Sequence, residues 1–298
     1  MGIARRLTSV TGGELESFIF RIVTTSSNQT YELPIADYGS TTPNFTVKWD
    51  DGSENLIQSS SDVNKLHTYA SAGTYDIELN GVVPSFKVDN NSSYRGLYTA
   101  VLSWGQTSFR TLNFHGCSNL TSLPTSSGSA TGHDGLSTIF NLDNFLRSTG
   151  VTSLPTGLLD YMVNVTSFVD SFSFMSISSI PSGFFDNCTQ ALSFNSTFNQ
   201  CFSLSAIPSG LFDNNTSVTN FSSTFKSCTS IGSIPTGLFD NNTSVTTFFS
   251  VFRMPTTSNS LTGNAPELWT RNPVPLGLYA FRNATGLGNY ASIPANWK

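Results

Sequence analysis

The chain has 298 residues, of which 38% are hydrophobic, and it carries a formal net charge of −5. Only 11% of its residues are charged, against about a quarter in ordinary globular proteins. An acidic chain without a clustered basic footprint is not expected to bind nucleic acid or an anionic membrane. No run of 18 apolar residues occurs, so no membrane-inserted segment is expected, and the length favours two domains.

The N-terminal segment is not expected to be a secretory signal. Residues 1–16 contain no apolar stretch of the kind that a secretory signal requires. We expect this segment to be an arm that docks the protein onto a larger assembly.

Residues 17–92 predict a small antiparallel β domain. Ser17–Val23 and Thr74–Leu79 are short runs of β-branched and aromatic residues, and the second run alternates strictly. Between them, the Asp50-Asp51-Gly52 sequence follows Trp49 and indicates a turn in which glycine adopts positive φ. Short strands at this spacing are typical of a β-sandwich.

Within this region, Trp49-Asp50-Asp51-Gly52-Ser53, His67-Thr68-Tyr69-Ala70 and Gly73-Thr74-Tyr75-Asp76-Ile77 resemble the polycystic-kidney-disease (PKD) domain pattern. The resemblance implies an Ig-like sandwich of the kind common in extracellular proteins, with a structural role for His67. The usual Gly-Asp-Gly turn of that family is Asp-Asp-Gly here. Asp50, Asp51 and Glu54 could hold Ca²⁺, but the alternating acidic spacing of a calcium loop is absent, so a plain turn is favoured.

Residues 93–260 contain a repeat of 27 residues. The octapeptide that starts at Ile180 returns at Ile207 and Ile234, and a looser copy starts at Leu154. Repeats of this length indicate stacked coils, because one copy cannot bury its own apolar face. Each copy also contains a half-repeat, which predicts a helical turn with a phenylalanine and then a short strand, so that stacked copies would form two narrow parallel sheets.

The segments Phe198-Asn199-Gln200-Cys201-Phe202-Ser203-Leu204 and Phe225-Lys226-Ser227-Cys228-Thr229-Ser230-Ile231 resemble the BspA-type leucine-rich repeat proteins. That resemblance implies a right-handed solenoid with a binding or adhesive role and no catalytic residues. The fold class expected for the whole chain is therefore mainly β: an Ig/PKD-like sandwich followed by a leucine-rich-repeat-type solenoid with short helical turns. We expect Phe198 and Phe225 to touch.

Cysteine positions follow the repeat. Cys201 and Cys228 occupy one slot in successive copies, where the preceding copy has Met175. A slot filled by Cys or Met indicates a buried apolar position. A Cys201–Cys228 disulfide is sterically conceivable, but a column of reduced cysteines is the favoured interpretation.

Two polar positions also recur. Asp160, Asp186, Asp213 and Asp240 share one slot and should form a column. Either each carboxylate accepts backbone N–H bonds from its own turn, or the column is a stripe that binds cations. Asn187, Asn214 and Asn241 form a second column, for which stacked amides are expected.

Residues 261–298 depart from the repeat and predict a C-terminal cap. Asn264 could cap a short helix with Pro266 in its first turn. Trp269 and Trp297 are expected to cover the last coil.

No metal-ligand spacing or catalytic motif occurs, so neither an enzyme nor a cofactor is expected. Two functions stay open. The first is a structural protein of a virion (capsid decoration, head fibre or tail-associated) that binds other virion proteins through its N-terminal region and a host glycan or receptor through its repeats. The second is a secreted or cell-surface bacterial adhesin of the BspA type. Homo-oligomers are compatible with both.

Overall fold

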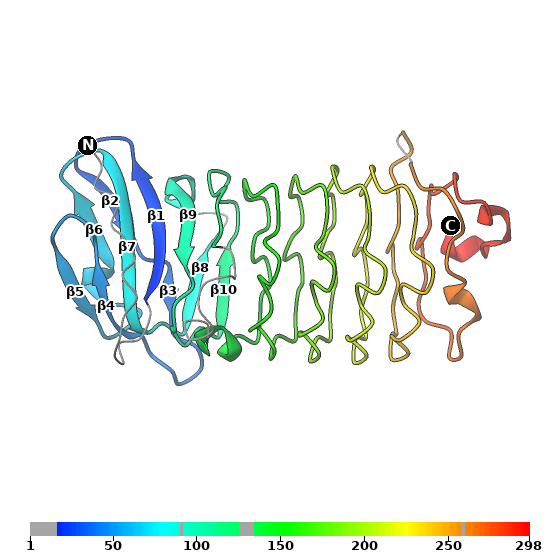
Figure 1. Cartoon of the computed structure of the whole chain (residues 1–298), viewed down its shortest axis with the longest axis horizontal. Helices are drawn as coiled ribbons and strands as arrows, with labels where there is room; N and C mark the ends of the chain where they lie inside the picture. The colour runs from blue at the N-terminus through cyan, green and yellow to red at the C-terminus, as the bar shows by residue number, and fades with distance from the viewer. Residues whose placement is uncertain (1–16, 90–91, 125–133, 258–259) are drawn as a thin grey trace.

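The protein is elongated, with β-strands at its N-terminal end and a row of stacked coils leading to its C-terminal end (Figure 1). The computed structural model describes residues 17–89, 92–124, 134–257 and 260–298; the expected docking arm, residues 1–16, lies outside them. The strands are β1 (Phe18–Thr24), β2 (Gln29–Glu32), β3 (Ile35–Ala36), β4 (Asn44–Lys48), β5 (Glu54–Ile57), β6 (Leu66–Tyr69), β7 (Gly73–Val82), β8 (Ser85–Val88), β9 (Tyr98–Ser103) and β10 (Thr111–Phe114). The described helices are short 3₁₀ turns: η1 (Val63–Lys65), η2 (Arg95–Leu97), η3 (Asp134–Thr138), η4 (Leu268–Thr270), η5 (Tyr290–Ser292) and η6 (Ala295–Trp297).

The strands form a five-stranded sheet in the order β5-β4-β7-β1-β9, a three-stranded sheet in the order β10-β8-β3, and the pair β2-β6. Strand β1 alternates buried and half-buried residues along its length, as expected for a strand with one face on the core. It pairs with β7 in antiparallel register from Phe18↔Leu79 to Thr24↔Gly73. The two strands predicted most clearly from the sequence are therefore confirmed.

The sheets pack face to face through aromatic side chains. Phe18 and Phe20 of β1 each lie 5.2 Å, centroid to centroid, from the ring of Phe86 on β8. Tyr31 and Tyr98 join their hydroxyls at 2.7 Å within the same core. Since both phenols are fully buried, this bond satisfies polar atoms that would otherwise be costly to desolvate. The two packed β layers are compatible with the expected sandwich, and its membership of the PKD family stays a prediction.

Hydrogen bonding continues across the domain boundary expected between residues 92 and 93. Strand β9 lies beyond that boundary but pairs with β1, and β10 pairs in parallel with β8. Parallel bridges then link Ala100 to Ser122 and Thr111 to Asn141, in the first coils. The buried core is thus continuous from the sheets into the coils.

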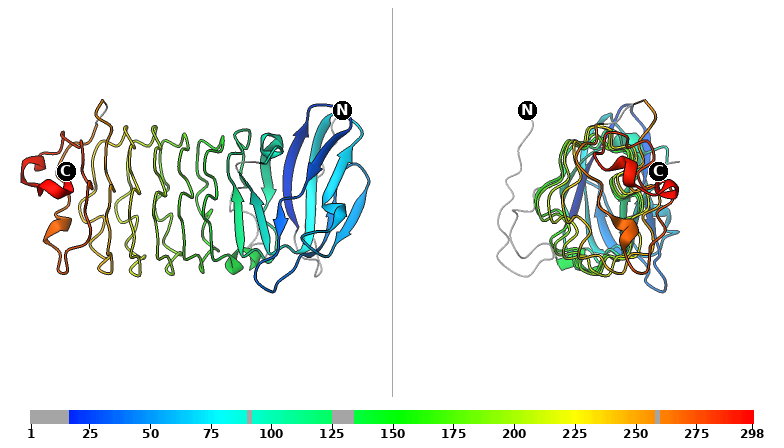
Figure 2. Two further views of the ribbon diagram at one scale, coloured as in Figure 1. Left: turned by 180° about the vertical axis from the view of Figure 1, so that it is seen from behind. Right: turned by 90° about the vertical axis from the view of Figure 1, so that its right-hand side faces the viewer.

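The expected leucine-rich-repeat-type solenoid with short helical turns is wrong. The described residues contain no α-helix, and no strand occurs between 134 and 257. The two narrow parallel sheets are absent from this range as well, because neighbouring copies meet through isolated single-residue bridges. One such series runs Asn141, Ser167, Ser193, Asn220, Thr247, Leu276. The copies are instead irregular, turn-rich coils, which overlie one another in the end-on view (Figure 2).

Left-handed residues explain why these coils form neither helix nor strand. Ser196 and Gln200 have φ of 57° and 59°, and the same pair of conformations recurs in neighbouring coils. Each such residue turns the chain and breaks the repeating dihedrals of helix or strand. Backbone N–H groups then alternate in their partners: Thr197 donates locally to the carbonyl of Phe194, whereas Phe198 donates to Thr224 of the next coil at 2.9 Å.

Phenylalanine rings form columns through the coils. Phe198 and Phe225 stack at 5.6 Å with an interplanar angle of 6°, so their predicted contact is confirmed. Phe225 in turn stacks on Phe252 at 5.3 Å, and Phe252 on Phe281 at 6.1 Å. A second column passes through Phe194 and its equivalents in the same way. These buried rings form the hydrophobic core of the coils.

Aromatic side chains close the C-terminal end. Trp297 stacks on Phe281 at 6.5 Å, and Trp269 meets the same ring edge-on at 6.2 Å, so the predicted cover is confirmed. The predicted cap is wrong in one detail: η4 follows Glu267 and has no side-chain cap, so Asn264 does not cap it. The carbonyls of the residues at 296 and 297 accept N–H bonds from the last coil.

Candidate functional site

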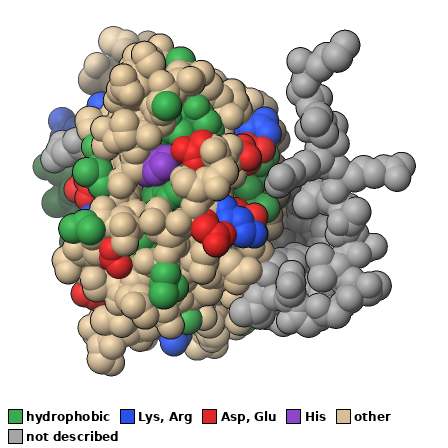
Figure 3. Space-filling model, turned by 90° about the vertical axis from the view of Figure 1, so that its left-hand side faces the viewer, with side chains coloured by type: hydrophobic (Ala, Val, Ile, Leu, Met, Phe, Trp, Pro, Cys, Tyr) green, Lys and Arg blue, Asp and Glu red, His purple; other side chains and the backbone are tan. Residues whose placement is uncertain are grey.

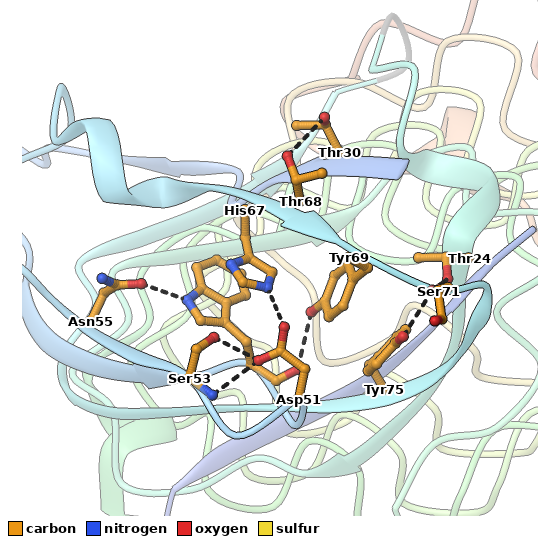
Figure 4. A network of polar contacts seen from close by, with 11 residues as sticks. Thr24, Thr30, Asp51, Ser53, Asn55, His67, Thr68, Tyr69, Ser71 and Tyr75 are labelled. Atoms are coloured by element: carbon orange, nitrogen blue, oxygen red, sulfur yellow. Dashed lines mark hydrogen bonds and ion pairs between the residues drawn. The ribbon is translucent and has the colours of Figure 1, made fainter. Parts of the chain in front are cut away.

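A compact polar corner follows β4 in the sandwich (Figure 4). Asp51 Oδ1 accepts hydrogen bonds from the N–H and hydroxyl of Ser53, and its Oδ2 lies 2.7 Å from His67 Nε2. The imidazole stacks on Trp49 at 4.5 Å, with 8° between the ring planes. Gly52 supplies the expected positive φ, 93°. His67 therefore braces the turn, in agreement with its expected structural role.

The carboxylates of this corner are engaged within the protein. Partial burial opposes ionisation of Asp51, but its hydrogen bonds with Ser53 and His67 outweigh that effect and lower its pKa. Asp50 accepts the N–H of Asp76 at 3.0 Å. A calcium ion would have to displace these partners, so the plain turn describes this loop better than a metal site.

The repeated aspartates lie at exposed turns of the coils. Gly210 has φ of 71°, and a Cβ placed on it would lie 2.9 Å from Asp213 Oδ2; Gly237 and Asp240 repeat the arrangement. The N–H of each aspartate donates to the carbonyl of its glycine, but no backbone group in the described residues donates to the carboxylates of Asp186, Asp213 or Asp240. The expected backbone bonds to these side chains are thus not formed, and the carboxylates face solvent, where water screens their repulsion.

An open hollow of about 460 Å³ separates two of these turns, lined by Ser209, Gly210, Asp213, Thr236, Gly237, Asp240 and Asn241. Its lining offers hydroxyl, amide and carboxylate groups. Within the described residues no group of three or more His, Cys, Asp or Glu is placed to hold a metal ion. The cation stripe of Asp160, Asp186, Asp213 and Asp240 is therefore not proposed further.

The asparagine column differs from expectation. The exposed Asn187 and Asn241 do not stack as amides: Asn187 donates to Asp160 Oδ1 at 3.4 Å, and Asn241 to the carbonyl of Asp213 at 3.3 Å. The buried amides lie one residue later, at Asn215 and Asn242.

Each buried amide bridges to the preceding coil. Asn215 Nδ2 donates to the carbonyls of Phe185 and Cys188, and Asn242 Nδ2 donates to Phe212 and Asn215. The doublets Asn214-Asn215 and Asn241-Asn242 were the available signal, but sequence alone does not tell which member faces inward.

All four cysteines are buried free thiols. The Sγ of Cys201 and of Cys228 each lie about 3 Å from a carbonyl oxygen of the preceding coil, at Phe172 and Phe198. Burial raises the pKa of the Cys188 and Cys201 thiols to about 12. Such thiols are poor nucleophiles at neutral pH, so they contribute packing rather than chemistry.

A basic strip runs along another side of the last coils. Lys226, Arg253 and Arg282 each directly follow a stacked phenylalanine, at Phe225, Phe252 and Phe281. The guanidinium carbons of Arg253 and Arg282 lie 5.9 and 4.9 Å from the centroid of the same ring, Tyr279. We call Lys226, Arg253 and Arg282 the basic strip. Lys226 and Arg253 lie in the repeats expected to contact a ligand, and Arg282 lies in the segment expected to be the C-terminal cap. The sequence patterns did not single out these three residues.

No helix in the described part of the chain is long and apolar enough to cross a membrane. No protein-family model matches the chain, and no curated protein matches it in sequence. The resemblances to PKD domains and BspA-type repeats therefore stay predictions.

Proposed function

We propose that the chain is a non-enzymatic structural protein of a virion, as a capsid decoration, head fibre or tail-associated protein, that displays its coils for attachment to a host surface or glycan. The observation that carries this proposal is the open polar hollow between the turns of Asp213 and Asp240. Carboxylate, amide and hydroxyl groups that face outward are suited to hydrogen bonding with sugar hydroxyls.

The stacked core supports this role. Rings such as Phe198 and Phe225 lock neighbouring coils in register, so the turns on the surface are held at fixed spacing. A surface organised before binding loses less conformational freedom when a ligand docks. The coils therefore supply a rigid, extended contact surface.

The opposite end is suited to assembly. Figure 3 shows acidic, basic and apolar side chains mixed over the N-terminal end, without dominance of one charge sign. Leu56, Val63 and Leu66 of this region are 51%, 83% and 52% exposed. Scattered apolar groups among mixed charges fit a protein–protein contact, which is where we place the docking to other virion proteins.

A glycan array with the full-length protein tests attachment. We expect binding to at least one glycan class, reduced in the double variant Asp213→Ala/Asp240→Ala. The matched control is Asp37→Ala/Glu267→Ala, which removes two exposed carboxylates elsewhere and should bind as the parent does. Absence of binding to every glycan would refute the attachment role.

The location is tested separately by antibody labelling. Labelled particles in electron micrographs are expected for a virion component. Labelling confined to bacterial cell surfaces would instead support the adhesin.

A further inference from the structure

The basic strip is one part of a column that runs the length of the coils. Backbone bonds fix its register: Gln200 N–H donates to the carbonyl of Lys226, Ser227 to Arg253 and Met254 to Arg282, at 2.8 to 2.9 Å. The equivalent positions in successive coils, from the N-terminal side, are Arg147, Ser173, Asn199, Lys226, Arg253 and Arg282.

Charge is distributed unevenly along this column. Arg147, at the N-terminal end, forms a 2.8 Å ion pair with Asp170. In contrast, the basic strip makes no ion pair among the residues that the structure describes, and the segments 222–228, 249–255 and 278–284 contain no Asp or Glu. Three cations on adjacent coils repel one another, so an anion from outside the chain would be bound favourably there.

Tyr279 holds two of these cations in place. Arg253 and Arg282 approach the same ring, and the ring of Phe249 lies 6.3 Å from Tyr279. A guanidinium that packs against an aromatic face keeps its in-plane N–H groups available to a carboxylate or sulfate. Because these groups are ordered before binding, they can contact an anion at little entropic cost.

We propose that Lys226, Arg253 and Arg282 bind an acidic saccharide chain, one whose sulfate or carboxylate groups recur along its length. This rests on the proposed attachment function and adds to it a second contact surface, on another side of the coils from the hollow between Asp213 and Asp240. Successive coils place one cation each along the strip, which matches a ligand with repeated anionic groups. Toward the N-terminal side the column continues with the uncharged Asn199 and Ser173, so the cations without an ion pair are confined to the last three coils.

A nucleic acid is a poorer fit to the same strip. Nucleic acid binding relies on the neutralisation of many phosphates by a broad basic surface, whereas this chain has a net charge of −5 and the strip has three cations. Competition by nucleic acid is nevertheless included in the test as an outcome.

The test measures binding of the full-length protein to a sulfated glycosaminoglycan oligosaccharide and to a neutral oligosaccharide of the same length, by surface plasmon resonance at two salt concentrations. We expect binding to the sulfated chain only, weakened by added salt. In Arg253→Gln/Arg282→Gln the dissociation constant should rise at least tenfold, since bonds to charged groups are lost. The control Lys48→Gln/Lys87→Gln, with the same change in net charge, should bind within twofold of the parent.

Unchanged binding in Arg253→Gln/Arg282→Gln, equal losses in both double variants, or displacement of the sulfated chain by single-stranded DNA at equal charge concentration would each overturn the basic strip as an acidic-saccharide site. Binding of the neutral chain alone would overturn this inference and leave the attachment function standing. Absence of binding to either chain, together with a blank glycan array, would overturn both. Matching circular dichroism spectra and melting temperatures ensure that the variants are folded.

Discussion

The sandwich and the coils solve the same problem, the pairing of buried backbone groups, in different ways. In the sandwich, β1 pairs along its length with β7 on one side and is paired with β9 on the other. In the coils, one N–H donates within its own coil and the next to the neighbouring coil, and left-handed residues separate the two directions. Regular strands tolerate many side chains at each position, whereas the coils depend on particular residues in every copy. Substitutions in the coils should therefore be more position-specific.

The largest effect is expected for Phe225→Ala. Its ring lies between those of Phe198 and Phe252, so truncation leaves a cavity in the middle of the column. We expect a loss of about 3–5 kcal/mol in the free energy of unfolding, measured by urea denaturation. Phe249→Ala, which truncates a half-buried ring, is the control and should lose about 1 kcal/mol or less. Equal losses in the two variants would show that the column is not a packed core.

The second test separates the two members of one asparagine doublet. Asn215→Leu removes an amide that donates to the buried carbonyls of Phe185 and Cys188. Each carbonyl keeps one backbone N–H donor, from Cys188 and Ala191 respectively, so the loss of the two amide hydrogen bonds between coils should cost about 1–3 kcal/mol. Asn214→Leu changes the exposed neighbour and should shift stability by no more than about 0.5 kcal/mol. A larger loss of stability in Asn214→Leu than in Asn215→Leu would contradict the assignment of Asn215 as the inward-facing amide.

A smaller effect is expected from Gly210→Ala. The backbone there has φ of 71°, and the added Cβ would approach Asp213 Oδ2. Because the carboxylate can move aside, the dihedral strain dominates, at about 1–2 kcal/mol. Gly232 has open space around its Cα and no positive φ, so Gly232→Ala should be neutral or slightly stabilising. Thermal melts of both variants distinguish conformational strain from a general intolerance of alanine.

The smallest effect concerns the sandwich and is a dependence on pH. The pKa of Asp51 is lowered in the folded state, so its contribution to stability is present above its ordinary pKa and is lost as pH falls through the lowered value. Because the group is largely exposed, this contribution should stay below about 1 kcal/mol. Asp51→Asn should flatten the fall in melting temperature between about pH 5 and pH 3. An equally steep fall in the melting temperatures of the parent and of Asp51→Asn would contradict this contribution of Asp51.

Sequence patterns predicted the sandwich strands better than the coils for a physical reason. The alternation of Tyr75, Ile77 and Leu79 specifies a strand by itself, and β7 was found there. Phe198 and Phe225 predicted a contact between copies but not the backbone that brings them together. Left-handed conformations at residues such as Ser196 and Gln200 leave little trace in sequence, because neither is glycine.

The candidate surfaces show the same contrast. The aspartate slot is visible as a repeated letter, yet its members turned out to face solvent without a metal site. The basic strip is harder to find in the sequence because its column reads Arg, Ser, Asn, Lys, Arg, Arg, with no residue type kept in every copy. Only the register of the coils reveals that Lys226, Arg253 and Arg282 are neighbours.

Arg271 follows the last full copy of the repeat and packs against it. Its guanidinium donates to the carbonyls of Asn242 and Phe239, the places that the amide of one more copy would take. Arg271 thereby occupies the carbonyls to which another copy would bond, which disfavours head-to-tail association of molecules into fibres. Gene duplication could still lengthen the molecule by inserting whole 27-residue copies upstream, each adding about 5 Å. The length of the protein would then change in steps of one copy, while the N-terminal sheets and the C-terminal cap stay unchanged.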